Sequence, residues 1–419
     1  MKRRRRCFVT FLLVLAAACG RASETAPTIG SWAGTITTEG NVTTVVNESG
    51  SVWGGKARLV EEASIGVESG APEYMLGRIS SVHADGQRIA VLDPQARMVR
   101  LYDYAGNFIA NVGGPGEGPG ELRRPELLTM DGAGAIYVLD VGDHRIHQFA
   151  ADGGFVTAWS GAEPACCIWK PVPAPEGRLW MPVEVVDRTT RERRSGFQLH
   201  GPEGPEGEVS WLPEIPFDPP TYRVDGRDTA TPLAPRISWN ITPAGGLVAG
   251  AGDRYRFETV AADGSKIVVE RYWEPTPIDP DEREWWRRLT VAMTSRLIAG
   301  WSWDGAEIPR TKPAFSMLVP AMSGDIWVRR DTGTVRLDDC MKDPLAELPG
   351  EGRIERCFRG VFVLDVFGSD GRYLGEVETP PGFGLFHADG ETVVAVVTDE
   401  AGTLRVKRYR LVPPAEAGS

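Results

Sequence analysis

A repeated segment limits the possible folds of this chain more than any other sequence feature. The stretch "HADGQRIAVLDPQARMVRLYDYAGNF", which starts at His83, aligns with "MDGAGAIYVLDVGDHRIHQFAADGGF", which starts at Met130. Asp93 corresponds to Asp140, and the aromatic residue and turn glycine that follow keep the same offset. Short β-rich runs separated by turns, repeated at this length, are typical of the four-stranded blades of a β-propeller.

Weaker copies of the unit continue along the chain, in "GRLWMPVEVV", "PAGGLVAGAGDRYRFETVAADGSKIVVERY", "GVFVLDVFGSDGRYLGEV" and "HADGETVVAVVTDEAGTLRVKRYRL". We therefore predict an all-β fold, a six-bladed β-propeller of four-stranded antiparallel blades over residues 43–413, with seven blades as the alternative. The last copy lacks an outer strand, and residues 51–60, "SVWGGKARLV", are predicted to supply it. Such closure by strands from both chain ends removes exposed sheet edges.

One repeat carries a motif that resembles a known family. The run "DVGDHRI", which contains Asp140, Asp143 and Arg145, resembles the D-x-x-N-x-R-I signature of NHL repeats, with aspartate in place of asparagine. The first copy keeps Asp93 but has Met98 at the arginine position. The run "GEGPGEL" is similar to the loop between blades in bacterial six-bladed propeller lipoproteins. The resemblance implies the fold from about residue 50 to 412 and does not indicate an activity.

The glycine-rich stretch that contains this run, "VGGPGEGPGELRRP", is not a phosphate-binding loop. It has no G-x-G-x-x-G pattern and no Walker lysine, and its prolines and acidic residues oppose the binding of anions. It follows one predicted strand and precedes another rather than a helix. We interpret it as a connection between two blades.

The first residues are predicted to direct export. Residues 1–18 combine a basic start with a short apolar run, as in a signal peptide, and the run is too short to span a bilayer. The sequence "AAAC" resembles a bacterial lipobox, which implies that Cys19 is lipidated and anchors the chain to a membrane, with residues 19–42 as a tether. Gly20 favours the outer membrane by the same resemblance. We expect a periplasm-facing or surface-exposed lipoprotein of the bacterial envelope. The alternatives are an ordinary signal peptide with an incidental cysteine, and twin-arginine export.

Four further cysteines lie in a setting that would be oxidising after export. We predict a disulfide between Cys340 and Cys357, which would close a loop of moderate length. Cys166 and Cys167 either form a vicinal bridge or stay free. No histidine lies near either pair in the sequence, so a metal site at the cysteines is not expected.

The net charge argues against one class of partner. It is −11, and it becomes more negative when Lys2 and Arg3 to Arg6 are removed with the leader. Nucleic-acid binding depends mainly on cationic neutralisation of phosphates, so no nucleic-acid partner is expected.

The insertions in the repeats point to one working face. They cover residues 161–170, 213–236, 274–313 and 331–359, in connections that share one face of a propeller. The third is predicted to contain a helix that Asp279 and Glu282 cap and Gly300 ends. A stripe is expected to pack on the propeller, and Trp286 to stay partly exposed; the stripe comprises Trp285, Leu289, Ala292, Met293 and Leu297.

Candidate binding residues lie where strands should meet this face. They are Asp93, Asp140, Arg145, Arg329, Arg330 and Trp286. His83 and His387, in identical "HADG" contexts at the opposite end, are expected to hydrogen-bond turns, and His144 and His147 should point to opposite sides of a strand.

The sequence has no G-x-S-x-G, H-E-x-x-H or EF-hand motif. We therefore predict a binding or scaffold module, without a cofactor, for an envelope protein, peptide or glycan. The alternatives are a hydrolase or lyase with a divalent metal in the central channel, and a structural envelope component.

Overall fold

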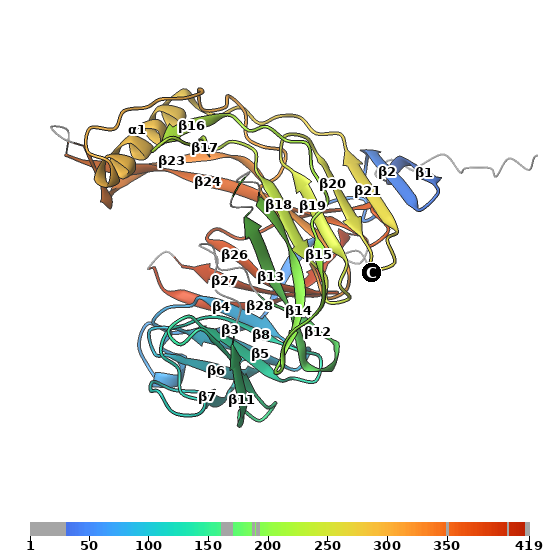
Figure 1. Cartoon of the computed structure of the whole chain (residues 1–419), viewed down its shortest axis with the longest axis vertical. Helices are drawn as coiled ribbons and strands as arrows, with labels where there is room; N and C mark the ends of the chain where they lie inside the picture. The colour runs from blue at the N-terminus through green and yellow to red at the C-terminus, as the bar shows by residue number, and fades with distance from the viewer. Residues whose placement is uncertain are drawn as a thin grey trace, which may run out of the picture.

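The computed structural model describes residues 31–160, 171–186, 189, 193–348, 352–399 and 402–414. The predicted leader, Cys19 and the Cys166–Cys167 pair lie outside these ranges. The described residues form six sheets around a common axis, and each is built on four antiparallel strands, as predicted (Figure 1). In every blade, strands that follow one another in sequence are neighbours in the sheet.

The first three blades follow the chain from residue 81 to 211. Blade 1 has β4 (Ser81–Ala84), β5 (Arg88–Asp93), β6 (Met98–Asp103) and β7 (Phe108–Val112). Blade 2 has β8 (Pro125–Met130), β9 (Ile136–Asp140), β10 (Arg145–Phe149) and β11 (Phe155–Ser160). Blade 3 has β12 (Val172–Ala174), β13 (Arg178–Val186), β14 (Arg193–Gly201) and β15 (Gly204–Trp211). Two short 3₁₀ helices, η1 (Pro72–Tyr74) and η2 (Pro175–Gly177), lie in connections.

The last three blades carry the additions. Blade 4 has β18 (Ile237–Ile241), β19 (Leu247–Ala251), β20 (Arg256–Val260) and β21 (Lys266–Arg271). Blade 5 has β22 (Met317–Pro320), β23 (Ile326–Leu348), β24 (Gly352–Phe367) and β25 (Tyr373–Val377). Blade 6 has β26 (Phe383–Asp389), β27 (Thr392–Thr398), β28 (Leu404–Val412) and β3 (Arg58–Ile65). The hairpin β16 (Thr221–Val224) with β17 (Arg227–Ala230) precedes blade 4, and α1 (Pro280–Leu297) precedes blade 5.

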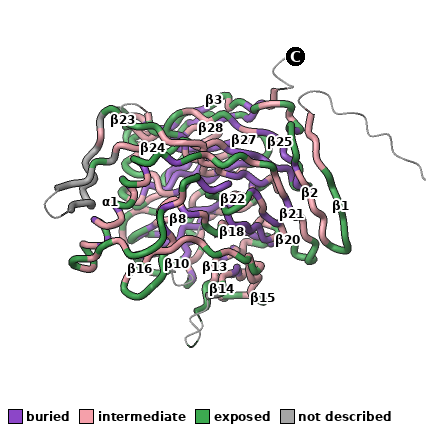
Figure 2. The backbone as a smooth tube through the Cα atoms, turned by 90° about the horizontal axis from the view of Figure 1, so that it is seen from above, coloured by how far each residue is buried: buried purple, intermediate pink, exposed green. Residues whose placement is uncertain are grey.

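Apolar clusters lie between each pair of adjacent blades, including the pair that joins the two chain ends. Leu92 meets Leu128 between blades 1 and 2, and Ile65, Val82 and Val394 belong to the cluster between blades 6 and 1. The other four clusters lie between blades 2 and 3, 3 and 4, 4 and 5, and 5 and 6. A single blade is too small to bury both of its faces, so the radial stacking of the blades supplies the core. The buried residues are the purple segments in Figure 2.

The ring closes through an N-terminal strand, although its bounds differ from the prediction. β3 pairs antiparallel with β28, so the closing strand is Arg58–Ile65 rather than residues 51–60. The sequence before it turns at Gly54, whose φ is +72°, and runs beside β25, with Ala57 bridged to Val377. This turn explains why the predicted strand starts too early.

A second N-terminal element was not predicted. β1 (Ala33–Glu39) and β2 (Val42–Ser49) form a hairpin, and β2 adds to β21 in parallel, which extends blade 4 to six strands. Its first strand lies within residues 19–42, the predicted tether. The buried Asn47 side chain accepts hydrogen bonds from Trp32 and the Tyr373 amide and donates to the Glu270 and Gly371 carbonyls. The hairpin is thereby fixed to blades 4 and 5.

Candidate ligand-binding site

Three of the four insertions gather on one side of the wheel. α1, the hairpin β16–β17 and the far ends of β23 and β24 lie together in Figure 1. Residues 331–359, predicted as a loop insertion, are instead the long extension of the β23–β24 hairpin, whose register continues to Leu348 and Gly352. The predicted disulfide is present within it and joins Cys340 to Cys357. The insertion 161–170 lies outside the described residues.

The helix begins as its sequence predicts and is attached differently. Asp279 caps it by accepting a hydrogen bond from the Asp281 amide at 2.7 Å. Glu282 does not complete a capping box; it turns to the propeller, where its Oε1 lies 2.5 Å from Lys312 Nζ. Both side chains are at most 5% exposed, and Thr334 donates to the second carboxylate oxygen. This buried pair fixes the first turn of the helix to blade 5.

The apolar stripe of α1 is shorter than predicted. Trp285, Leu289 and Ala292 are buried, and Trp285 also donates a hydrogen bond to the Glu355 carbonyl at 2.6 Å. Met293 and Leu297 are exposed, Leu297 by 85%, because the helix projects beyond the sheet that it covers. Packing therefore holds the helix from Trp285 to Ala292, next to the hairpin β23–β24.

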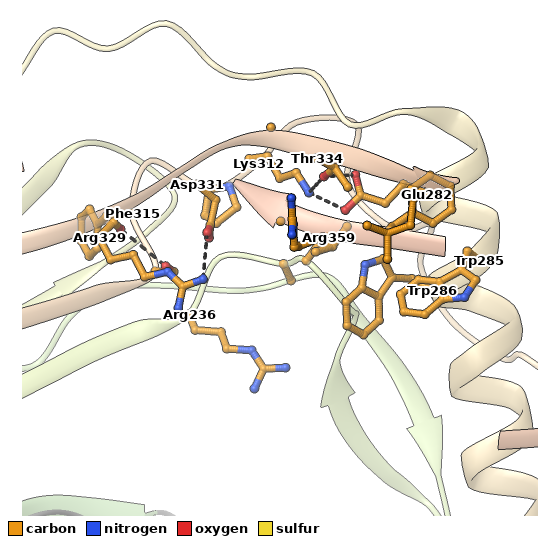
Figure 3. Close-up of a pocket in the computed structure, with 18 residues that line it drawn as sticks. Arg236, Glu282, Trp285, Trp286, Lys312, Phe315, Arg329, Asp331, Thr334 and Arg359 are labelled. Carbon is orange, nitrogen blue, oxygen red and sulfur yellow. Dashed lines mark hydrogen bonds and ion pairs between the residues drawn. The ribbon is translucent and has the colours of Figure 1, made fainter. Parts of the chain in front are cut away.

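A cavity of about 560 Å³ lies beneath this helix, within the size range of small-molecule sites. Its lining comes from α1, from the hairpin β23–β24, and from the connections that enter blades 4 and 5. Figure 3 shows the labelled lining residues: Arg236, Glu282, Trp285, Trp286, Lys312, Phe315, Arg329, Asp331, Thr334 and Arg359.

Cationic side chains dominate one part of this cavity. Arg329 stacks over the Phe362 ring at 4.2 Å and makes a long contact with Asp331, at 3.4 Å, while its buried Nε has no hydrogen-bond partner. Arg236 and Arg359 also line the cavity and are exposed. Within the described part of the chain, neither guanidinium forms a hydrogen bond or an ion pair. In Figure 3, Arg236 and Arg359 lie between Arg329 on one side and the tryptophans of α1 on the other.

Two of the predicted binding residues meet in this cavity, and the others lie elsewhere. Arg329 and Trp286 line it. Arg330, next to Arg329, turns away and pairs with Asp365 and Glu376 between the blades. Arg236 and Arg359, which the sequence analysis did not select, complete the cationic part. Each lies in a predicted insertion, but nothing local in the sequence distinguishes either one from the chain's other arginines.

The two repeated aspartates hold turns. Asp93 is buried and accepts hydrogen bonds from the amides of Gly77, Gln95 and Ala96 and from the Arg100 side chain. Asp140 accepts hydrogen bonds from three backbone amides, those of Arg123, Arg124 and Gly142. In both cases the carboxylate satisfies amides where one blade connects to the next. Arg145 is the first residue of β10; it is exposed and does not line the cavity.

Asp140 also belongs to a group of potential metal ligands. Its carboxylate, that of Asp143 and the His147 ring offer donor atoms within 4.8 Å of one another. Asp140 already accepts three amide hydrogen bonds, and His147 Nε2 is paired with Asp143 at 3.0 Å. The two carboxylates are therefore satisfied by protein groups, while His147 Nδ1 is buried without a hydrogen-bond partner. His144 lies in the turn before β10, with φ +59°, and not on the strand as predicted.

The two "HADG" histidines lie in the central channel. A smaller cavity of about 290 Å³ is lined by the innermost strands of the blades and includes both of them. The His83 and His387 rings are 4.7 Å apart, and His83 Nδ1 lies 3.0 Å from the Thr129 hydroxyl of the next blade. These contacts join neighbouring blades, whereas the sequence predicted hydrogen bonds to turns.

Comparisons with known proteins support the fold. Residues 71–184 match a family described as 6-bladed beta-propeller. A member of the DUF4221 family from Bacteroides vulgatus is 12% identical, with 85% of this chain and 99% of that chain covered and a TM-score of 0.50. A Bacteroides fragilis protein described as exported is 9% identical, with 88% and 99% covered and a TM-score of 0.45. The sequence matches no curated protein. The family match and the likeness to the Bacteroides vulgatus protein concern the fold alone.

Proposed function

We propose that this protein is an exported, lipid-anchored binding module of the cell envelope, and that the cavity beneath α1 is its ligand site. One observation carries the assignment of the site. Elements from three separate insertions wall one cavity, and they place there arginines whose guanidinium groups have no partner among the described residues. Exposed guanidinium groups are hydrated in the free protein, so it is their convergence on one walled cavity that indicates a ligand site.

The position in the cell rests on the sequence. The basic and apolar start and the "AAAC" run favour export and lipidation at Cys19. Among the described residues, no helix is long and apolar enough to cross a bilayer. The disulfide between Cys340 and Cys357 fits an oxidising compartment.

The site can be tested by filling the cavity. Gly360 lines it, a Cβ added to it would meet no heavy atom within 4 Å, and its φ is not positive. Gly360→Trp would therefore occupy the cavity with little strain. Gly132, in a turn of blade 2, has the same open surroundings and gives a matched control, Gly132→Trp.

The full-length protein in detergent would be screened by ligand-observed NMR against small organic acids, neutral sugars and short peptides. We expect compounds that bind the wild type and Gly132→Trp but lose binding to Gly360→Trp. Binding that Gly360→Trp leaves unchanged, or no binding by any compound, would contradict the assignment of the site.

A further inference from the structure

The charge of the cavity differs from the charge of the protein. Acidic residues outnumber basic ones over the whole chain, 57 to 46. The cavity reverses this balance. Its lining contains four cations, Arg236, Lys312, Arg329 and Arg359, and two carboxylates, Glu282 and Asp331.

The two carboxylates compensate two of the cations unequally. Glu282 is fully engaged by Lys312 at 2.5 Å and by Thr334. Asp331 meets Arg329 at 3.4 Å, a long contact that leaves Arg329 Nε buried and without a hydrogen-bond partner. Arg236 and Arg359 keep their whole guanidinium groups available, judged over the residues that the structure describes. The cavity therefore offers a net positive charge and several unused N–H donors.

Guanidinium donors have a matching acceptor. Their planar, forked N–H groups fit a carboxylate or phosphate in bidentate geometry, and such charge-assisted hydrogen bonds contribute about 1.5–3 kcal/mol. Arg329 is held in place by the Phe362 ring, so little conformational freedom is lost when it binds.

The opposite wall is aromatic. Trp286 lines the cavity from α1, in edge contact with Trp285 at 4.8 Å between centroids, and Phe358 closes the same wall. Indole faces favour flat rings, whether aromatic or the apolar face of a sugar. A ligand that fills the cavity would place its ring here and its charge toward the arginines.

We propose that the cavity binds a carboxylate-bearing ring compound, with Arg236, Arg329 and Arg359 contacting the carboxylate and Trp286 the ring. This inference rests on the proposed function, because it gives the ligand class of the same site. The ring carboxylate has two sources in an envelope, an aromatic acid or a uronic acid residue of a glycan.

Calorimetric titrations of the full-length protein would use four probes in two matched pairs. 2-Naphthoate and its neutral amide represent the aromatic source, and digalacturonate and its neutral methyl ester represent the glycan. We expect one acid to bind at least about tenfold more tightly than its neutral partner, and more weakly at high salt. The pair that shows this difference identifies the source.

The same titrations with variants connect the affinity to the arginines. Arg236→Gln with Arg359→Gln should lower the affinity for the acid about tenfold or more, corresponding to about 1.4 kcal/mol. Arg227→Gln, on the exposed hairpin outside the cavity, is the matched control and should leave it unchanged.

Three outcomes would overturn the inference: neutral probes that bind as tightly as the acids, an unchanged affinity in the double variant, or no binding by either acid. None of these removes the proposed function. That function fails separately, when Gly360→Trp has no effect on the compounds that bind.

Discussion

Arg329 and Arg330 are neighbours on β23, yet their guanidinium groups lie on opposite faces of the blade. Arg329 lines the cavity beneath α1, whereas Arg330 Nε lies 2.9 Å from Asp365 Oδ2 inside the interface with blade 4. Successive side chains of a strand point to opposite faces, so the pair divides the proposed binding role of Arg329 from the structural role of Arg330.

The first prediction compares these two arginines. Asp365 is fully buried and also accepts hydrogen bonds from Arg271, Tyr255 and Tyr373. Arg330→Met removes one of its two cations, and we expect the free energy of unfolding to fall by about 3 kcal/mol, measured by urea denaturation. Arg329→Met, at a side chain that is 38% exposed, should change it by less than about 1 kcal/mol. Equal losses in the two variants would contradict this division of roles.

The second prediction concerns acid stability. Burial raises the pKa of Asp365, but the guanidinium groups of Arg271 and Arg330 and the Tyr255 hydroxyl outweigh it and hold the pKa below the usual value of 3.8. In acid the unfolded chain therefore takes up this proton before the folded one does. The stabilisation is fully present well above pH 3.8 and is lost as the pH falls toward and through the folded pKa.

Urea denaturation between pH 7 and pH 2.5 would measure this effect. We expect Asp365→Asn to be less stable than the wild type at pH 7 and to lose less stability on acidification below about pH 4. Arg372→Gln, which breaks a half-exposed pair with Asp370, controls for the general loss of surface ion pairs. If the free energy of unfolding of Asp365→Asn fell with pH below pH 4 as steeply as that of the wild type, another carboxyl group would dominate the loss of stability in acid.

The fold could be predicted because its signal is repeated. The spacing of Asp93 and Asp140 recurs in the structure as two equivalent turns, each with a carboxylate that accepts backbone amide hydrogen bonds. Strand bounds were less predictable where contacts outside the blade decide them. β1 and β2 owe their position to the sheet edge of β21 and to Asn47, and nothing in the local sequence reveals either partner.

The site could be predicted in outline only. The insertions indicated the side of the wheel on which the candidate cavity lies, and two of the residues selected from the sequence, Arg329 and Trp286, line it. Arg236 and Arg359 are brought to the same cavity by elements more than a hundred residues apart, and such convergence depends on tertiary structure. The sequence also could not show that Glu282 pairs with Lys312 instead of capping its own helix.

The third prediction concerns this ion pair. Lys312→Met leaves Glu282 buried beside an apolar group, and we expect a loss of about 3–5 kcal/mol in the stability of the docked helix. Hydrogen exchange of the α1 amides should rise more than exchange in blades 1 and 2, because the pair is the buried polar link of the first helical turn to blade 5. Arg336→Met is the control: it breaks a pair with Asp281 whose side chains are 69% and 68% exposed, and should cost less than about 1 kcal/mol. Unchanged exchange in α1 of Lys312→Met would mean that Trp285 and Leu289 hold the helix without the ion pair.

The fourth prediction concerns closure of the wheel. β3 is the one strand of blade 6 that comes from the N-terminal part of the chain, and Ile65 packs in the cluster between blades 6 and 1. A chain that starts at Gly50 lacks the hairpin β1–β2 but keeps β3, whereas a chain that starts at Gly66 also lacks β3. The shorter chain leaves β28 as an open edge and uncovers the apolar cluster, so we expect it to aggregate and to lose a single cooperative unfolding transition. The longer chain should lose some stability, since Asn47 is removed, and remain monomeric.

Size-exclusion chromatography and thermal unfolding of both chains would measure this difference. If the chain that starts at Gly66 stayed monomeric and unfolded in one transition near the temperature of the other, the five remaining complete blades would suffice for a stable fold, and closure by β3 would not be what holds the wheel together.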